Sequence, residues 1–209
     1  MVEKSIYEIH WIGGNPSPQL TFRSLSRCRM KEKFLKNAKH EYSPSKRAIL
    51  LIFAGIVFLG LLPYFLVYFS TLLDRYFGLP HLGVGIINGV VGVCFIVAGL
   101  LFGWWSNYVQ FTIGRGTPVP VMATQQLIIQ KPYSYCRNPM ALGTIVAYLG
   151  VAILIGSISA VGLVLLGAVL LLTYIKLLEE KEMELRFGDA YREYRKQTPF
   201  LLPRFRQRK

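Results

Sequence analysis

Polar residues able to bind a charged ligand gather in three short elements of an otherwise apolar chain. The Gly-Arg-Gly sequence at residues 114–116 predicts a compact turn, in which glycines allow close approach of a ligand and the arginine offers a planar fork for a carboxylate. Arg137 lies just ahead of Pro139, a proline suited to the first position of a helix. Glu179 and Glu180 directly follow an apolar run, at a place where Lys or Arg is more usual.

Each of these elements also has a purely structural interpretation. Residues 114–116 suit an ordinary interfacial turn, and Arg137 suits an anchor that extends its charged end to the membrane surface. The glutamates suit a solvated helix face with Lys181 and Arg186 as partners. None of the three elements alone therefore decides between ligand binding and a structural role.

Four apolar runs must position these elements. The chain has 209 residues, of which 53% are hydrophobic and only 17% charged, a composition that excludes a disordered chain and points to a membrane. The runs cover residues 48–73, 82–105, 139–155 and 158–178, and about 20 apolar residues suffice to cross a bilayer core of about 30 Å. The sequence therefore predicts an all-α integral membrane protein with four transmembrane helices, the third of them short.

Three features predict how these runs fold and pack. Pro63 lies inside the first run and predicts a kink, because it removes one helical donor and crowds the carbonyl four residues back. Glycines along the second run, including Gly92 and Gly99, predict close packing against another helix. Only Gly156 and Ser157 separate the third run from the fourth, so a tight helical hairpin is expected there.

Charge asymmetry predicts the orientation. Most of the 24 Lys and Arg residues lie in the segments before residue 48 and after residue 178, whereas the loop at residues 74–81 has one base and the Gly156–Ser157 turn has none. The positive-inside rule places both termini and the loop between the second and third runs in the cytosol. The membrane domain is then residues 48–209, and residues 179–209 form a cytosolic segment expected to contain an amphipathic helix along the membrane surface.

Residues 1–47 form a basic cytosolic tail with two open interpretations. Its apolar residues fall loosely at helical spacing among bases, which fits a helix on anionic lipid, but a flexible solvated tail fits equally. Nucleic acid binding is not expected, because membrane tethering already explains the charge.

Other kinds of site are disfavoured. Neither the cysteines nor the histidines form a cluster with metal-ligand spacing, so no metal site is expected. The runs contain no buried acid, base or histidine on which a pump or ion channel could depend. These dispersed residues are Cys28, Cys94, Cys136, His10, His40 and His81.

Taken in order, the motifs resemble a known superfamily. They are Gly-Arg-Gly-Thr-Pro at 114–118, Pro-Tyr-x-Tyr-x-Arg-Asn-Pro-Met-x-x-Gly at 132–143, and Glu-Glu followed by Phe-Gly-x-x-Tyr-x-x-Tyr at 179–194. This order and spacing resembles the isoprenylcysteine carboxyl methyltransferase and phospholipid methyltransferase superfamily, which consists of integral membrane enzymes. The resemblance extends from residue 114 to residue 203.

The resemblance implies S-adenosyl-L-methionine as cofactor, with Arg137 and Glu180 as catalytic residues. It associates the Gly-x-Gly element and the paired glutamates with cofactor binding and places the Arg-Asn-Pro element beside the reaction centre. An arginine would hold the cofactor carboxylate, a glutamate its ammonium or ribose hydroxyls, and Tyr148 is one candidate to line the adenine pocket. The expected cofactor-binding residues are Gly114, Arg115, Gly116, Tyr133, Tyr135, Arg137, Asn138, Pro139, Leu142, Glu179 and Glu180.

The implied function is methyl transfer at the cytosolic membrane face to a lipophilic acceptor. The acceptor is either a prenylated cysteine carboxylate, which Arg137 would orient, or a phospholipid amine, whose proton Glu180 would take. The acceptor is expected to enter sideways along the glycine-lined second run. The competing interpretation is a non-catalytic four-span scaffold or small transporter. Ala141, Asn138 and Lys131 depart from residues common in the family, which leaves the identity of the acceptor open.

Overall fold

The computed structural model describes residues 43–83, 85–114 and 126–204. The chain divides into two units, residues 1–37 and residues 38–209, and every described residue belongs to the second unit. The described part consists of helices and connecting segments and contains no strand, so the all-α prediction is confirmed for it. The expectations for residues 1–42, Arg115 and Gly116 fall outside the described residues.

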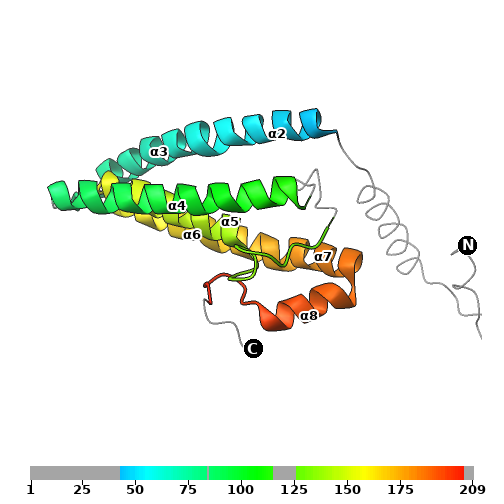
Figure 1. Cartoon of the computed structure of the whole chain (residues 1–209). Coiled ribbons are helices and arrows are strands. Elements are labelled where there is room, and N and C mark those ends of the chain that lie inside the picture. Colours follow the sequence, from blue (N-terminus) through cyan, green and yellow to red (C-terminus); the bar gives the residue numbers. More distant parts are fainter. Residues whose placement is uncertain (1–42, 84, 115–125, 205–209) are drawn as a thin grey trace, which may run out of the picture. The chain divides into compact units, whose positions relative to one another are not determined.

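Two of the helical stretches contain a π-helical turn. In chain order the described elements are α2 (Pro44–Ile56), the π-helical turn η1 (Val57–Leu61), α3 (Leu62–Phe77), α4 (Ile86–Thr112), α5 (Pro139–Leu154), α6 (Ile158–Tyr174), the π-helical turn η2 (Ile175–Glu179), α7 (Glu180–Phe187) and α8 (Asp189–Gln197). One continuous stretch runs through α2, η1 and α3, and a second runs through α6, η2 and α7 (Figure 1).

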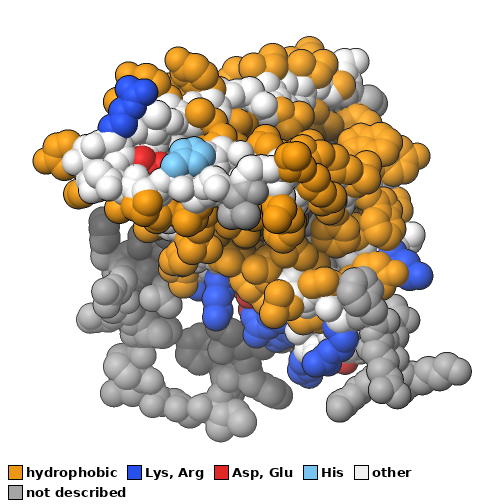
Figure 2. All heavy atoms as spheres, turned by 90° about the vertical axis from the view of Figure 1, so that its left-hand side faces the viewer, with side chains coloured by type: hydrophobic (Ala, Val, Ile, Leu, Met, Phe, Trp, Pro, Cys, Tyr) orange, Lys and Arg blue, Asp and Glu red, His pale blue; other side chains and the backbone are white. Residues whose placement is uncertain are grey.

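Three helical stretches are long and apolar enough to cross a membrane: Ala48–Phe77, Ile86–Thr112 and Ile158–Phe187. Helix α5 is also apolar, but its 16 residues extend about 24 Å at 1.5 Å per residue, less than the thickness of a bilayer core. Hydrophobic side chains cover most of the face in Figure 2, and basic side chains gather at its lower edge. These features agree with the predicted membrane protein and with a short third run.

Close to Pro63, where a kink was predicted, the structure has the π-helical turn η1. Pro63 has no N–H to donate to the carbonyl four residues earlier, so an uninterrupted α-helical register cannot pass through it. The wider turn η1 ends immediately before the helix that contains Pro63 near its start. Tyr148 on α5 donates its hydroxyl hydrogen to the carbonyl of Phe58 in η1, at 2.6 Å. The third apolar helix therefore stabilises the irregular turn in the first.

Helices α4 and α5 pack backbone to backbone through glycines spaced seven residues apart. A Cβ on Gly99 would lie 2.5 Å from backbone atoms of Gly143 and Ala147, and a Cβ on Gly92 would lie 2.9 Å from the carbonyl oxygen of Gly150. This confirms the predicted glycine-mediated packing of the second run. Gly89 and Gly103 of the same helix meet no atom within 4 Å of a Cβ, and entry of an acceptor along the second run stays a prediction.

The predicted tight hairpin between α5 and α6 is confirmed. Gly156 has a φ of 62°, in the left-handed region that favours glycine. Ser157 caps α6 by accepting a hydrogen bond from the Ala160 backbone at 3.0 Å. Asp74, near the end of α3, accepts a hydrogen bond from the Ser159 backbone at 3.1 Å. The first apolar helix is thereby joined to the hairpin.

We expect Gly99→Ala to destabilise the protein by about 1–3 kcal/mol, because the added methyl group would force apart two helix backbones that have no room to yield. Gly103→Ala is the matched control, since a Cβ at Gly103, one turn further along the same helix, meets no atom within 4 Å. Unfolding of both variants in the same mixed micelles, titrated with a denaturing detergent, measures the difference. Equal stability of the two variants would contradict this packing.

Candidate active site

The loop between α4 and α5 is held against the end of α4 by two aromatic side chains. The Tyr133 hydroxyl donates to Oε1 of Gln110 at 3.0 Å. The Tyr135 ring packs edge-on against Trp105, with ring centroids 6.4 Å apart. Burial raises the pKa of Tyr133, with further contributions from Cys136 and from the charge of Glu179. The phenol therefore remains protonated and keeps its hydrogen for Gln110.

Pro139 begins α5, as its sequence position predicts, and this fixes the backbone that carries Arg137. Asn138 precedes the helix but makes no capping bond with its side chain. Instead its Nδ2 donates to the carbonyl of Phe200 at 3.0 Å, and the Arg137 backbone N–H donates to the carbonyl of Pro199 at 2.9 Å. The start of α5 is thus attached to residues more than sixty positions later in the chain.

The π-helical turn η2 places Glu180 at the start of α7. A π-helical turn holds about one residue more than an α-helical turn, so side chains after it are rotated by about 100° relative to a straight α-helix. Glu180 is buried with 9% of its surface exposed, whereas Glu179 is half-buried. The two adjacent glutamates therefore occupy different environments, a difference that the sequence alone did not predict.

Arg137 and Glu180 form a buried ion pair. Arg137 Nη1 lies 2.7 Å from Glu180 Oε1, and 11% of each side chain is exposed. The Phe200 ring covers the guanidinium at 5.6 Å from its centroid. Because Arg137 Nη1 and Glu180 Oε1 are each other's partners at 2.7 Å, the buried atom of the pair that lacks a hydrogen bond to the described residues is Arg137 Nε. Buried polar atoms of this kind are rare in folded proteins and call for a ligand or another explanation.

The glutamates near this pair in the chain differ in whether they have a basic partner. Arg186 pairs with Glu182 at 3.5 Å, and Glu184 pairs with Arg192 on the exposed side at 2.7 Å. Glu179 forms no ion pair with the residues that the structure describes. A half-buried carboxylate without a counter-ion favours a cationic group nearby.

The structure brings part of the expected site together. Arg137 and Glu180 are in contact, Asn138 adjoins them in the chain, and the Tyr133 phenol is close enough to Glu179 to be affected by its charge. Their convergence agrees with the predicted site, but their roles in binding and catalysis remain predictions.

The structure places the other expected residues at the ends of α4 and α5 and in the loop between them. Gly114 is buried just beyond α4, and the Tyr135 ring is directed at Trp105. Leu142 is half-buried on the first turn of α5. Tyr148 lies nine residues after the start of α5 at Pro139, about 14 Å at 1.5 Å per residue. Its hydroxyl binds the Phe58 carbonyl, and its role at the adenine pocket stays a prediction.

Three residues of the site were not identified from the sequence. Gln110 binds the Tyr133 hydroxyl, Phe200 covers Arg137, and Tyr191 lies beside the Arg137–Glu180 pair. Burial raises the pKa of Tyr191 to about 12, with the Glu180 charge adding to the shift and the Arg137 charge opposing it. Tyr191 belongs to the Phe-Gly-x-x-Tyr-x-x-Tyr motif, but the motif did not indicate that this side chain faces the ion pair.

The thiol of Cys136, next to Arg137, is unreactive because it is buried. Its side chain is fully buried, and burial raises the pKa of its thiol to about 11. Because the thiolate is the nucleophile, the cysteine next to Arg137 is unsuited to covalent catalysis at neutral pH.

Residues 87–190 match the model of a known family, phospholipid methyltransferase. The matched segment begins at the start of α4, includes Arg137, Glu179 and Glu180, and ends within α8. The chain therefore belongs to the superfamily of isoprenylcysteine carboxyl and phospholipid methyltransferases, and the resemblance of its motifs is confirmed. The family and the apolar helices identify a membrane methyltransferase whose substrates are lipids. A comparison with curated proteins found no match.

Breaking the buried ion pair should destabilise the protein more than removing it. We expect Glu180→Leu to cost about 3–5 kcal/mol, because it leaves the Arg137 charge buried without a partner. Adding Arg137→Leu to that variant should restore much of the loss, since no buried charge remains.

The exposed ion pair of Glu184 with Arg192 is the control, and Glu184→Leu should cost less than about 1 kcal/mol. Melting temperatures in one detergent, compared across the four proteins, measure these effects. A double variant less stable than Glu180→Leu would contradict the interpretation of the pair as a coupled buried unit.

Proposed function

We propose that this protein is an S-adenosylmethionine-dependent methyltransferase that methylates the amine of a phospholipid headgroup at the cytosolic membrane face. The observation that carries the proposal is the buried Arg137–Glu180 pair, which lies within the segment that matches phospholipid methyltransferases and leaves Arg137 Nε without a hydrogen bond to the described residues. The family name favours the amine acceptor over a prenylated cysteine carboxylate. A non-catalytic scaffold would leave the buried Arg137 Nε unexplained.

The residues present fit the proposed cofactor. S-adenosylmethionine carries a carboxylate, an ammonium group, ribose hydroxyls and an adenine ring, so its site requires an arginine, an acid and nearby apolar surface. The unsatisfied Nε of Arg137 is suited to the carboxylate. Glu179, which has no counter-ion among the described residues, is suited to the ammonium group. Tyr133 and Leu142 would contribute surface for the adenine.

When bound, the cofactor supplies a methyl group that is already activated by the sulfonium, so no nucleophilic residue is required. The protein must then position the reactants and exclude water. Arg137 would fix the position of Glu180. The Glu180 carboxylate would hold the acceptor amine and accept its proton. These are the catalytic roles that we assign to the two residues.

The proposed topology has four spans with both termini in the cytosol. It follows from the charge asymmetry of the sequence together with three long apolar helices and the shorter helix α5. The bilayer can thin locally around a short span at modest cost. With this topology the site is at the membrane boundary, where a polar cofactor arrives from water and a lipid acceptor arrives from the bilayer.

We expect purified protein in lipid vesicles to transfer a radiolabelled methyl group from S-adenosylmethionine to phosphatidylethanolamine. A prenylcysteine analogue offered in parallel should remain unlabelled, because the matched family methylates phospholipids. Chromatography of the extracted lipids identifies the product. Label in the prenylcysteine alone would reassign the acceptor, and label in neither would remove the support for an enzyme.

Glu180→Gln should weaken binding of S-adenosylhomocysteine by about tenfold, because the substitution removes the charge that orders Arg137. Glu184→Gln is the matched control and should bind within about twofold of the wild type, since Glu184 pairs with Arg192 and Arg195 on the exposed side. Calorimetry in detergent gives the dissociation constants. Equal weakening by the two substitutions would refute the placement of the site.

A further inference from the structure

The C-terminal segment after α7 is attached to the Arg137 loop by four hydrogen bonds. We call residues 189–204 the C-terminal strap. Backbone bonds join Arg137 to Pro199 at 2.9 Å and Arg204 to Tyr135 at 3.0 Å. Side-chain bonds join Asn138 Nδ2 to the Phe200 carbonyl at 3.0 Å and the Tyr194 hydroxyl to the Tyr133 carbonyl at 2.6 Å. The strap therefore holds the loop at four successive places between residues 133 and 138.

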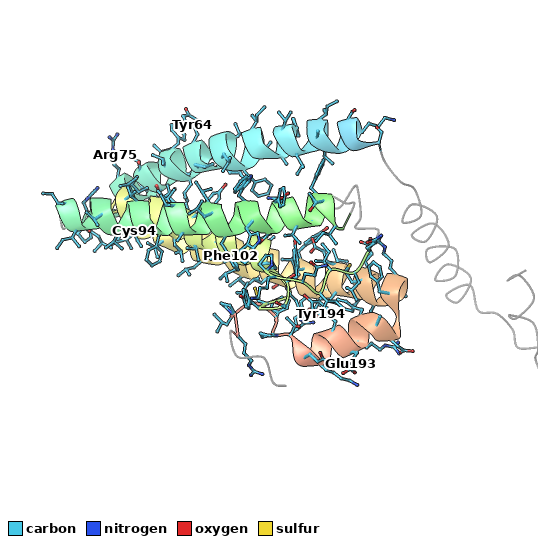
Figure 3. The ribbon with its side chains drawn as sticks, in the orientation of Figure 1. Tyr64, Arg75, Cys94, Phe102, Glu193 and Tyr194 are labelled. Carbon is cyan, nitrogen blue, oxygen red and sulfur yellow. The ribbon has the colours of Figure 1, made fainter. Side chains whose placement is uncertain are left out.

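Helix α8 directs its tyrosines into the protein. Tyr191 and Tyr194 are 4% and 5% exposed, and their rings are neighbours at 6.2 Å. Figure 3 shows Tyr194 between α8 and the rest of the structure, with Glu193 on the outer side. Apart from Ala190, the exposed residues of α8 are charged or polar: Asp189, Arg192, Glu193, Arg195, Lys196 and Gln197. The apolar face of this helix is therefore occupied by the protein's own loop.

The strap also shapes the surroundings of the Arg137 guanidinium. Phe200 covers one face of the group, and Tyr191 lies close enough for Arg137 and Glu180 to influence its pKa. Thus Arg137 contacts α7 through Glu180 and the strap through its backbone and through Phe200. The position of the guanidinium depends on both.

The loop has few hydrogen bonds of its own near Arg137. Residues 126–138 contain no helix or strand, and the backbone bonds within them, from Ser134 to Gln130 at 3.1 Å and from Tyr135 to Pro132 at 3.0 Å, end before Arg137. The strap supplies the bonds at Arg137 and Asn138. The match to the phospholipid methyltransferase family ends at residue 190, before Phe200, and the motif that contains Tyr191 and Tyr194 gives neither tyrosine a contact.

We propose that the C-terminal strap positions Arg137 for ligand binding, with Tyr194 as the positioning residue that fastens the strap to the loop. This inference rests on the proposed function, because the ligand in question is the methyl donor. Tyr194 acts through the Tyr133 backbone and does not itself touch the donor. Its loss should therefore weaken donor binding while the chemical step on bound donor changes little.

The test compares the wild type with Tyr194→Phe and with the control Tyr108→Phe in full-length protein whose Cys28 and Cys94 are replaced by serine. Tyr108 is 61% exposed on α4, and no bond of its hydroxyl to another described residue is seen. Cys136 lies within the fastened loop and is fully buried, so its rate of labelling by a maleimide reports loosening of the strap without any ligand.

In Tyr194→Phe we expect labelling of Cys136 to become about fivefold faster and KM for S-adenosylmethionine to rise about fivefold, the scale of one lost hydrogen bond. The value of kcat should stay within about twofold, and Tyr108→Phe should match the wild type in every measurement. Binding of S-adenosylhomocysteine, measured by calorimetry, should weaken in parallel with KM.

Three results would overturn the inference. Labelling of Tyr194→Phe at the wild-type rate would show that the hydroxyl does not fasten the strap. Faster labelling with an unchanged KM would show that the strap packs against the loop without positioning Arg137, and a fall in kcat alone in step with the melting temperature would show a general loss of folded protein. A wild type that neither binds S-adenosylhomocysteine nor transfers methyl groups would overturn the proposed function, and the labelling rates would still decide whether Tyr194 fastens the strap.

Discussion

A guanidinium and a carboxylate that are buried away from water are stable only when they pair with each other. This requirement constrains the packing of the helices around the candidate active site. Arg137 and Glu180 are both nearly buried and lie 2.7 Å apart. Burying either charge alone costs several kcal/mol, so the helices that carry them must be held in register. The pair is not fully satisfied by the residues that the structure describes. It is therefore a costly arrangement for stability alone and a suitable one for binding a charged ligand.

Three structural devices hold this register. The glycine contacts between α4 and α5 allow the two backbones to touch, which fixes the beginning of α5 relative to the end of α4. The π-helical turn η2 sets the direction of Glu180 at the start of α7. The C-terminal strap supplies hydrogen bonds to a loop that lacks regular structure. Each device acts on a different side of the ion pair.

Several parts of this arrangement could be predicted from the sequence because they depend on local chemistry. Apolar runs bounded by charges located the helices, and Pro139 located the first turn of α5. Two residues between runs were too few for anything but the Gly156–Ser157 hairpin. Other parts could not be predicted. The partner of Tyr148 is a carbonyl ninety residues away, and of the glycines in α4 it is Gly92 and Gly99 that face the backbone of α5.

The amino-acid sequence by itself determined the membrane class, the helical elements and the family, because hydrophobic periodicity, charge asymmetry and motif order are properties of neighbouring residues. Only the tertiary structure decided which of two adjacent glutamates pairs with Arg137, and that Phe200 and the tyrosines of α8 enclose that pair. The physical reason is that a π-helical turn and contacts between distant segments depend on packing of the whole unit. Neither the π-helical turn nor the long-range contacts produce a repeating pattern of residue types in the sequence.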